Sequence, residues 1–254
     1  MLKAVPAQPE SRVAELEAAL QGKDMPRHVA VIMDGNGRWG KLHGMERLEG
    51  HHEAIKAVRA TVTAAQDMQL PFLTLYCFST ENLNRPADEI HGLFELFMAV
   101  LDSQTEELHE RQVRIIFNGR MDWLPDELAT KFHSAVELTQ HNTGLTLNLC
   151  VMYSGRMEMM DAIRAAADAI AGGELSAKDL DEESFRRFLY QPDVPDPDLI
   201  IRTSGEQRIS NFLLWQLAYS ELIFTEVLWP DFSRADFLAA LLTYQQRNRR
   251  FGAV

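Results

Sequence analysis

The chain has 254 residues, of which 46% are hydrophobic and 24% charged, and its formal net charge is −12 at pH 7. This composition suits one large globular domain and argues against a disordered protein. A general nucleic-acid binder needs a basic stripe that neutralises phosphates, so we exclude that class. Any anionic ligand should therefore meet a local cluster of arginines.

Three further features bear on the compartment. The segment up to Lys23 contains acidic residues and no continuous apolar core, so it is unlike a secretory signal or transit peptide. No run approaches the roughly 20 apolar residues of a transmembrane helix. Cys77 and Cys150 each lie inside an apolar run, which favours buried thiols over a disulfide or metal site. We therefore expect a reducing, cytoplasmic location.

In chain order, we expect an N-terminal extension over residues 1–24, with a short amphipathic helix over Ser11–Gln21, and one domain over residues 25–254. Apolar and β-branched runs predict strands at His28–Met33, Phe72–Phe78, Val113–Phe117, Leu145–Val151 and Leu199–Ile201. Helical patterns lie between and after them, at His51–Met68, from Pro86–Asp88 to about Arg111, and at Pro125–His141, Met157–Ile170, Glu182–Leu189 and Ala235–Arg247. This alternation predicts an α/β fold with a mainly parallel sheet.

Polar motifs follow three of these strands, at Asp34–Arg38, Ser79–Arg85 and Arg202–Ser210. Ligands of open parallel sheets gather at the carboxyl ends of the strands. The three motifs are therefore expected to form one composite site.

The first motif is Asp34-Gly35-Asn36-Gly37-Arg38-Trp39. Backbone N–H groups and Arg38 could hold a diphosphate, and Asp34 suits Mg²⁺, although such a string can also be a simple turn. Arg47 and His51 are four residues apart and share a helical face, where they could meet phosphate or merely face solvent.

The second and third motifs carry hydroxyl, amide and guanidinium groups. Residues 79–86 could line the site or act as a capping loop. Residues 202–212 contain two arginines, whose planar side chains bind diphosphate oxygens in pairs, and a structural salt-bridge loop is the alternative. Glu221 could supply a second carboxylate to a hard metal ion.

Several long strings resemble the bacterial undecaprenyl diphosphate synthases, and the likeness spans about residues 27–252. They are HVAVIMDGNGR from His28, LYCFSTENLNRP from Leu75, NTGLTLN from Asn142, IRTSGEQRISNFLLWQLAY from Ile201 and VLWPDF from Val227. The resemblance implies a single catalytic domain over residues 25–254, with a mostly parallel six-stranded sheet flanked by helices that enclose a hydrophobic tunnel.

The implied activity is that of a Mg²⁺-dependent cis-prenyltransferase, which condenses isopentenyl diphosphate onto an allylic diphosphate such as farnesyl diphosphate. The implied product is undecaprenyl diphosphate, a lipid carrier for cell-wall synthesis. A homodimer and a peripheral contact with the inner face of the membrane for product release are also implied. A short-chain synthase and a non-catalytic partner subunit are the alternatives.

The resemblance also implies roles for individual residues. Asp34 matches the essential metal-linked aspartate, Glu221 a further metal contact, and Asn82 a residue that accepts a proton directly or through neighbours. Residues implied at the allylic diphosphate are Gly35, Asn36, Gly37, Arg38, Trp39, Arg47, His51, Ser79, Thr80, Glu81, Leu83 and Arg85. Those implied at the isopentenyl diphosphate are Arg202, Arg208, Ile209 and Ser210.

Three departures from the family pattern bear on substrate preference and product length. Leu83 stands where the family usually has tryptophan, and Met152–Arg156 replaces the commoner Asn-Tyr-Gly-Gly-Arg. Residues 119–122 also lack the usual Gly-Asp pair. None of the three removes a charged group that the resemblance assigns to catalysis.

Overall fold

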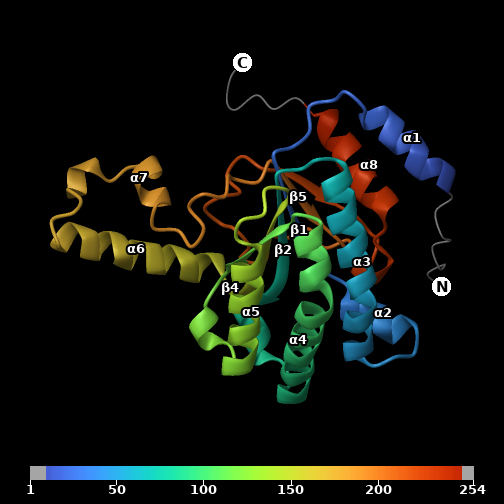
Figure 1. Cartoon of the computed structure of the whole chain (residues 1–254), viewed down its shortest axis with the longest axis horizontal. Helices are drawn as coiled ribbons and strands as arrows, with labels where there is room; N and C mark the ends of the chain where they lie inside the picture. Colours follow the sequence, from blue (N-terminus) through green and yellow to red (C-terminus); the bar gives the residue numbers. More distant parts are fainter. Residues whose placement is uncertain (1–9, 248–254) are drawn as a thin grey trace.

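A six-stranded, all-parallel sheet forms the centre of the protein (Figure 1), in a computed structural model that describes residues 10–247. The strand order is β3-β4-β2-β1-β5-β6, and every neighbouring pair is parallel. The strands are β1 (His28–Ile32), β2 (Phe72–Ser79), β3 (Arg114–Asn118), β4 (Thr146–Tyr153), β5 (Leu199–Arg202) and β6 (Glu221–Phe224). The expected α/β fold is confirmed, and the last strand is one that the residue pattern alone did not predict.

Consecutive strands are joined through helices or, between β5 and β6, through a long crossover without a helix, because parallel strands cannot be joined by a tight turn. The α-helices are α1 (Glu10–Leu20), α2 (Asn36–Leu42), α3 (Arg47–Asp67), α4 (Ala87–Glu110), α5 (Asp126–Thr139), α6 (Gly155–Ala171), α7 (Glu182–Arg186) and α8 (Arg234–Gln245). Short 3₁₀ turns lie at Thr80–Asn84, Met121–Trp123, Ala177–Asp179 and Trp229–Asp231. Among the described residues, no helix is both long and apolar enough to cross a membrane.

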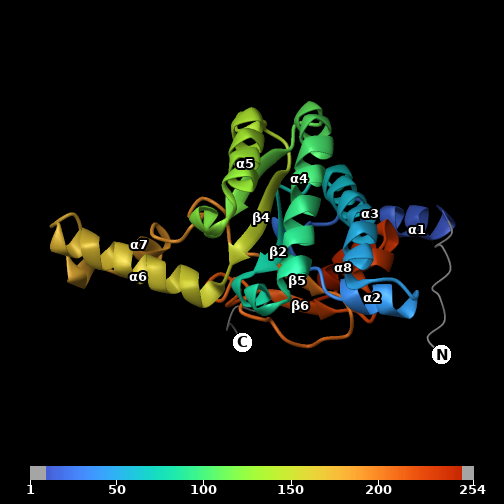
Figure 2. The same cartoon turned by 90° about the horizontal axis from the view of Figure 1, so that it is seen from below.

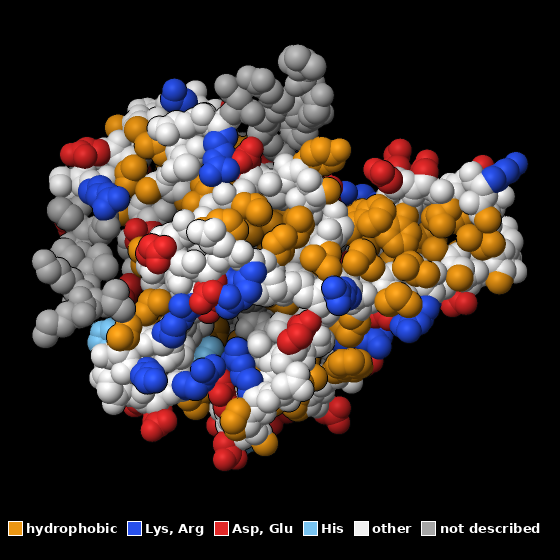
Figure 3. All heavy atoms as spheres, turned by 180° about the vertical axis from the view of Figure 1, so that it is seen from behind, with side chains coloured by type: hydrophobic (Ala, Val, Ile, Leu, Met, Phe, Trp, Pro, Cys, Tyr) orange, Lys and Arg blue, Asp and Glu red, His pale blue; other side chains and the backbone are white. Residues whose placement is uncertain are grey.

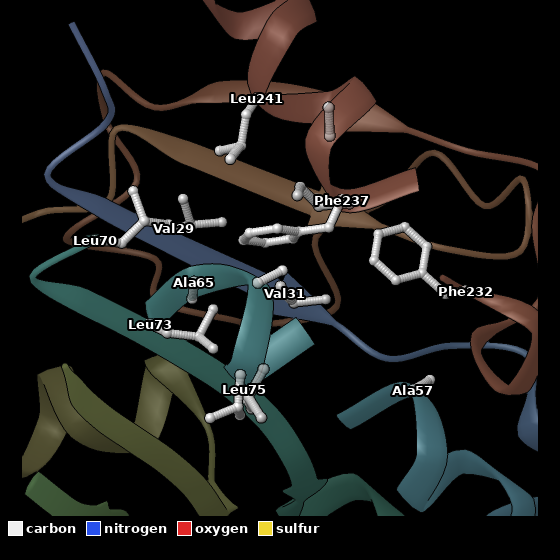
Figure 4. Packing of buried hydrophobic residues seen from close by; sticks show 14 of the residues in the cluster. Val29, Val31, Ala57, Ala65, Leu70, Leu73, Leu75, Phe232, Phe237 and Leu241 are labelled. Carbon is white, nitrogen blue, oxygen red and sulfur yellow. The ribbon is translucent and has the colours of Figure 1, made fainter. Parts of the chain in front are cut away.

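Successive side chains of a strand point alternately into two apolar layers, one on each face of the sheet. Val29 and Val31 of β1 face a core shared with α3 and α8, whereas Ala30 and Ile32 face a smaller cluster that includes Phe212. Figure 4 shows the larger core, in which β1 and β2 meet side chains of α3, α8 and the turn before α8: Ala57, Ala65, Phe232, Phe237 and Leu241. Both sheet faces are therefore covered, which explains the near-continuous hydrophobic runs of the strands.

Helix α1 packs along α8 at one side of the molecule (Figure 1). Leu20 belongs to the main core, and Arg234 at the start of α8 contacts Glu17 of α1 and Asp67 of α3, each at 2.6 Å. Ser233 caps α8 by accepting from the Asp236 N–H. The N-terminal helix is thus tied to the main body by both apolar and charged contacts.

Helices α6 and α7 project from the body as an arm (Figures 1 and 2). Near the base of the arm, buried Glu158 of α6 accepts from Tyr153 Oη at 2.5 Å and Gln216 Nε2 at 3.0 Å, and from the Tyr190 backbone N–H at 3.2 Å. Burial raises the pKa of Glu158, and these three donors lower it only in part. This network joins the arm to the sheet and to the segment after β5.

Candidate active site

A pocket of about 340 Å³ lies at the carboxyl ends of β1, β2 and β5, where a parallel sheet is expected to bind its ligand. It brings together all three polar motifs that the sequence singled out. The predicted site residues that line it are Asp34, Gly35, Asn36, Gly37, Arg38, Arg47, His51, Ser79, Asn82, Arg85, Arg202, Arg208 and Ser210.

The turn after β1 is held close to the segment after β5. A side chain at Gly35 would collide with Leu228, 2.9 Å from its Cβ position, and the residue has a φ of +109° that favours glycine. Thr203 Oγ1 accepts from the Asp34 N–H at 2.9 Å and donates to the Asp34 carbonyl at 2.6 Å. The Asp34 backbone is therefore fixed at the floor of the pocket.

Asp34 is paired with two arginines. Arg202 Nη2 donates to Asp34 Oδ2 at 2.7 Å, and Arg38 Nη2 lies 3.5 Å from Asp34 Oδ1. Burial by itself would raise the pKa of Asp34, but the hydrogen bond and charge of Arg202, with smaller contributions from Arg38 and the Gly35 N–H, lower it. The carboxylate is thus ionised and faces the pocket.

The loop after β5 is organised around the Arg202 side chain, which is only 4% exposed. Its Nη1 donates to Ser210 Oγ at 2.8 Å and to the Arg208 carbonyl. Ser210 is one of several non-glycine residues of this loop with positive φ, here 51°. Glu206 joins the loop to the first motif by contacting Arg208 and, at 3.1 Å, Arg38.

The opposite wall comes from the turn after β2 and the start of α3. The Ser79 N–H donates to Asn82 Oδ1 at 3.1 Å, which orients the amide at the first turn of the 3₁₀ segment. Arg47 and His51 lie on the same face of α3, as their spacing predicted, and face the pocket with Arg85. Burial, followed by the charge of Arg85, lowers the pKa of His51 to about 4. His51 is therefore a neutral hydrogen-bonding group near pH 7.

Five arginines line this pocket in a chain of net charge −12, namely Arg38, Arg47, Arg85, Arg202 and Arg208. Asp34 is the carboxylate that lines it with them. This local excess of guanidinium groups suits the pocket to an anion and is the kind of arginine cluster that we expected an anionic ligand to need.

Besides Glu221, five predicted residues lie outside the lining. Trp39 is buried, donates from Nε1 to Asp231 Oδ1 at 2.8 Å and stacks on His43, so its ring packs within the fold. Ile209 packs in the apolar cluster on the second face of the sheet. The other three, Thr80, Glu81 and Leu83, sit on the 3₁₀ turn beside the pocket, where Leu83 is 40% exposed.

Glu221 is placed far from Asp34. It is the first residue of β6 and pairs with Leu199, which in turn pairs with Val29 at the beginning of β1. Asp34 follows the other end of β1, roughly 10–15 Å further along the sheet. Glu221 instead accepts from Arg247 at 2.6 Å. Within one chain, the structure does not bring together the two carboxylates that the family pattern assigns to the metal.

Tyr76 is a pocket residue that the motifs did not indicate. Its ring stacks on Phe212 with centroids 4.5 Å apart, and its hydroxyl donates to the Ser210 carbonyl at 3.2 Å. It therefore connects β2 to the loop after β5. Ile32, Met33 and Phe78 also line the pocket. All four lie in apolar runs that predict buried core residues, so only their position beside the motifs could have indicated that they line the pocket.

Beneath the polar pocket lie two apolar cavities. The first, of about 140 Å³, is lined by side chains of α3, β2, α4 and β4, and it shares Met33, Asn36, His51, Tyr76 and Cys77 with the polar pocket. The second, of about 180 Å³, shares Ile55, Val58, Val100, Leu101 and Leu149 with the first. Its far end is polar and includes Arg59, Glu107 and Arg111. The three spaces thus follow one another between α3 and α4.

An arginine-lined pocket that borders apolar cavities defines an α/β protein suited to a ligand with an anionic head and an apolar tail. The family described as "Putative undecaprenyl diphosphate synthase" matches residues 32–252. The chain belongs to this family of prenyltransferases.

Relatives in sequence and structure agree with this membership. An isoprenyl transferase of Heliobacterium mobile is 44% identical over 91% of this chain and 88% of its own length. A ditrans,polycis-undecaprenyl-diphosphate synthase of Pasteurella multocida, named as specific for (2E,6E)-farnesyl diphosphate, is 44% identical over 92% of this chain and 97% of its own. The crystal structure of lavandulyl diphosphate synthase from Lavandula x intermedia, in complex with dimethylallyl diphosphate, has a TM-score of 0.88 and 36% identity, covering 90% of this chain and 98% of that one.

Proposed function

We propose that the protein elongates an allylic diphosphate, farnesyl diphosphate in the first instance, with isopentenyl diphosphate units to make undecaprenyl diphosphate. The observation that carries this proposal is the continuity between the arginine pocket and the apolar cavities, through shared residues such as His51 and Cys77. A diphosphate head would bind at the carboxyl edge of the sheet, and its isoprenoid tail would run between α3 and α4. The name of the Pasteurella multocida relative supports the same substrate and product.

Two groups of side chains suit two diphosphates. We assign the allylic diphosphate to the wall that carries Arg47, His51, Ser79 and Arg85. We assign isopentenyl diphosphate to the loop after β5, where Arg202 orients Ser210 and Arg208 is 58% exposed. Charge-assisted hydrogen bonds from guanidinium groups to phosphate oxygens would give most of the affinity at both places.

The donor set around Asp34 fits Mg²⁺ that binds together with a diphosphate. Mg²⁺ is commonly held by one or two carboxylates plus substrate phosphates, and among the described residues no group of three or more His, Cys, Asp or Glu could hold a metal without such help. Asp34 is ionised and borders the pocket, so it would contribute the protein ligand. When bound, the ion would neutralise charge on the diphosphate oxygens.

Electrons move in one direction in this reaction, from isopentenyl diphosphate through C1 of the allylic substrate to the departing diphosphate. The bond between C1 of the allylic substrate and its diphosphate oxygen breaks, and the diphosphate keeps the electron pair. The double bond of isopentenyl diphosphate then forms the new bond to C1, and loss of a proton forms the new cis double bond. The arginines of this chain stabilise the departing diphosphate. Because Asn82 Oδ1 already accepts from the Ser79 N–H, we assign Asn82 to positioning, with the proton passing through neighbouring groups to an oxygen of the released diphosphate.

The apolar cavities support a hydrophobic tunnel for the growing tail, because each CH₂ removed from water contributes about 0.8 kcal/mol. A short-chain product is the second candidate function. The similarity to lavandulyl diphosphate synthase favours keeping it, since related chains of this fold carry different product names.

The exposed hydrophobic side chains of the arm support a homodimer. Hydrophobic side chains gather along the arm in Figure 3, and Met160 and Ile163 of α6 are 46% and 50% exposed. This face suits a homodimer contact.

A long polyprenyl product would partition into lipid, so we also propose that a cytoplasmic enzyme releases it at the membrane surface.

The decisive experiment incubates pure protein with farnesyl diphosphate, labelled isopentenyl diphosphate and Mg²⁺ and sizes the dephosphorylated products. We expect products near 55 carbons, that is, eight additions. A set of products with one or two additions would establish the short-chain alternative. If no primer, including geranyl and dimethylallyl diphosphate, incorporates label, the protein is a non-catalytic subunit and the proposal fails.

A further inference from the structure

Glu89, a residue outside the pocket lining, holds two of the pocket arginines in place. Its Oε1 lies 3.2 Å from both Nε and Nη2 of Arg47 and 3.2 Å from Nη1 of Arg85. Arg47 begins α3, whereas Arg85 follows the 3₁₀ turn after β2, and Glu89 lies in the first turn of α4. One carboxylate oxygen therefore joins three elements of the fold.

The position of Glu89 is built into the packing. Its side chain is only 12% exposed. One turn further along α4, Gly92 lets the helix approach Leu48, since a Cβ there would lie 2.5 Å from Leu48 Cδ2. On the other side, Gly37 leaves room for the Arg47 guanidinium, whose carbon lies 3.0 Å from the Cβ position of Gly37.

Electrostatics explains what this carboxylate does. Two guanidinium groups held near one another repel, and a flexible arginine loses conformational freedom when it is fixed. A mostly buried carboxylate between them offsets the repulsion and satisfies one side of each fork. The remaining N–H groups stay available to the pocket, which Glu89 itself does not line. The arginines are therefore arranged before an anion arrives, which lowers the cost of binding.

We propose that Glu89 is a positioning residue for the allylic diphosphate, acting through Arg47 and Arg85. The proposal rests on the function proposed above for the arginine pocket. It differs from a competing role, in which Glu89 occupies the two guanidinium groups and must be displaced by the diphosphate. The two roles predict changes of opposite sign when the charge of Glu89 is removed.

The kinetic test compares Glu89→Gln and Glu89→Asp with the wild type, using farnesyl diphosphate, isopentenyl diphosphate and Mg²⁺. We expect Glu89→Gln to raise the KM for farnesyl diphosphate by about tenfold, the loss of one charge-assisted contact. The same substitution should change the KM for isopentenyl diphosphate and kcat by less than about twofold. Glu89→Asp keeps the charge and should recover part of the loss. Glu95→Gln is the matched control on the same helix, because Glu95 is exposed and pairs with His91 at 3.3 Å.

A second measurement keeps the inference separate from the proposed activity. Inorganic pyrophosphate binding, followed by titration calorimetry, needs no turnover, and we expect Glu89→Gln to weaken it while Glu95→Gln does not. In an Arg47→Ala background the effect of Glu89→Gln should be smaller than in the wild type. Unchanged binding by Glu89→Gln would overturn the proposal, and tighter binding would overturn it and establish the competing role. An equal loss for both substrates, with a lowered Tm, would overturn it in favour of a purely structural role.

Discussion

Arg202 Nη2 donates a 2.7 Å hydrogen bond to Asp34 Oδ2 and so joins the ends of β5 and β1 at the floor of the pocket. The same guanidinium also donates to Ser210 Oγ. The residue we assign to the metal and the loop we assign to isopentenyl diphosphate are thus linked by one nearly buried arginine. Changes at either end of this pair should therefore differ from changes at the exposed Arg208.

Removing the Asp34 carboxylate should abolish elongation with a moderate loss of stability. We expect Asp34→Ala and Asp34→Asn to lower kcat at saturating Mg²⁺ by at least about a hundredfold, as for the loss of a preorganised electrostatic group. Asp34→Ala also leaves the buried Arg202 without its carboxylate, which should cost about 1–3 kcal/mol of unfolding free energy. Thermal melts check folding, and near-wild-type turnover by a folded variant would contradict the metal assignment.

The two arginines of the loop after β5 should behave differently when replaced. Arg208→Ala should mainly raise the KM for isopentenyl diphosphate, because this side chain is exposed and its contact with phosphate is worth about 1.5–3 kcal/mol. Arg202→Ala should raise the same KM and also lower kcat and Tm, because it frees Asp34 and Ser210. Steady-state kinetics with each substrate varied in turn tests both. Wild-type constants in both variants would require another site for this diphosphate.

Acidification should destabilise the protein through buried histidines. Burial lowers the pKa of His28 from 6.5 to about 4, although the Pro195 carbonyl, which its Nδ1 contacts at 2.6 Å, opposes the shift. Between these two values the unfolded chain binds a proton that the folded protein does not, so stability rises with pH and is lost as pH falls. For His28 alone the loss could reach about 3 kcal/mol.

Denaturant unfolding at several pH values between 7.5 and 4.5 measures this effect. His28→Gln should flatten the dependence, whereas the same change at exposed His141 should leave it as in the wild type. His51, whose pKa is also about 4, should maintain a residual slope. An identical slope in His28→Gln and wild type would show that His28 does not carry the effect.

Much of the sheet could be predicted because its strands are buried on both faces and read as apolar runs. The predicted strand over His28–Met33, for example, is β1 over His28–Ile32. Strand β6, Glu221–Phe224, was missed by the residue pattern because it lies at the edge of the sheet, where none of its four residues is fully buried. Helix α3 begins at Arg47, four residues before its predicted start. Its first turn is stabilised by a cap in which Glu49 accepts from the Glu46 N–H, and this turn lacks the apolar periodicity on which the prediction was based.

The location of the pocket could be predicted from the sequence more easily than the side chains that line it. The three motifs meet because each follows a strand of a parallel sheet. The direction of a side chain within a motif depends on tertiary packing, however, so Trp39 turns to Asp231 and Ile209 packs, partly buried, against the apolar cluster that includes Phe212. Glu89 belongs to no motif, and its part in the site is visible only when α3 and α4 are brought together.

Cys77 of β2 lies where the polar pocket meets the first apolar cavity. Side chains on one strand face recur every second residue, so Leu75, Cys77 and Ser79 should share a face. In the structure Leu75 lines the first apolar cavity, Ser79 lines the polar pocket and Cys77 lines both. This agreement holds although the β2–β4 register shifts between Tyr76 and Ser79. Burial raises the pKa of the Cys77 thiol to about 12, so the side chain is a small neutral group.

Replacing Cys77 with a large side chain should therefore obstruct the tail. We expect Cys77→Phe to shift the products toward shorter chains, whereas Cys77→Ala should leave their length unchanged. A purely structural Cys77 would instead lower stability by about 1–3 kcal/mol on overpacking, with the length distribution of the wild type. Thin-layer sizing of dephosphorylated products, run beside a thermal melt, separates the two outcomes. Products of wild-type length from a folded, active Cys77→Phe enzyme would mean that the tail takes another route.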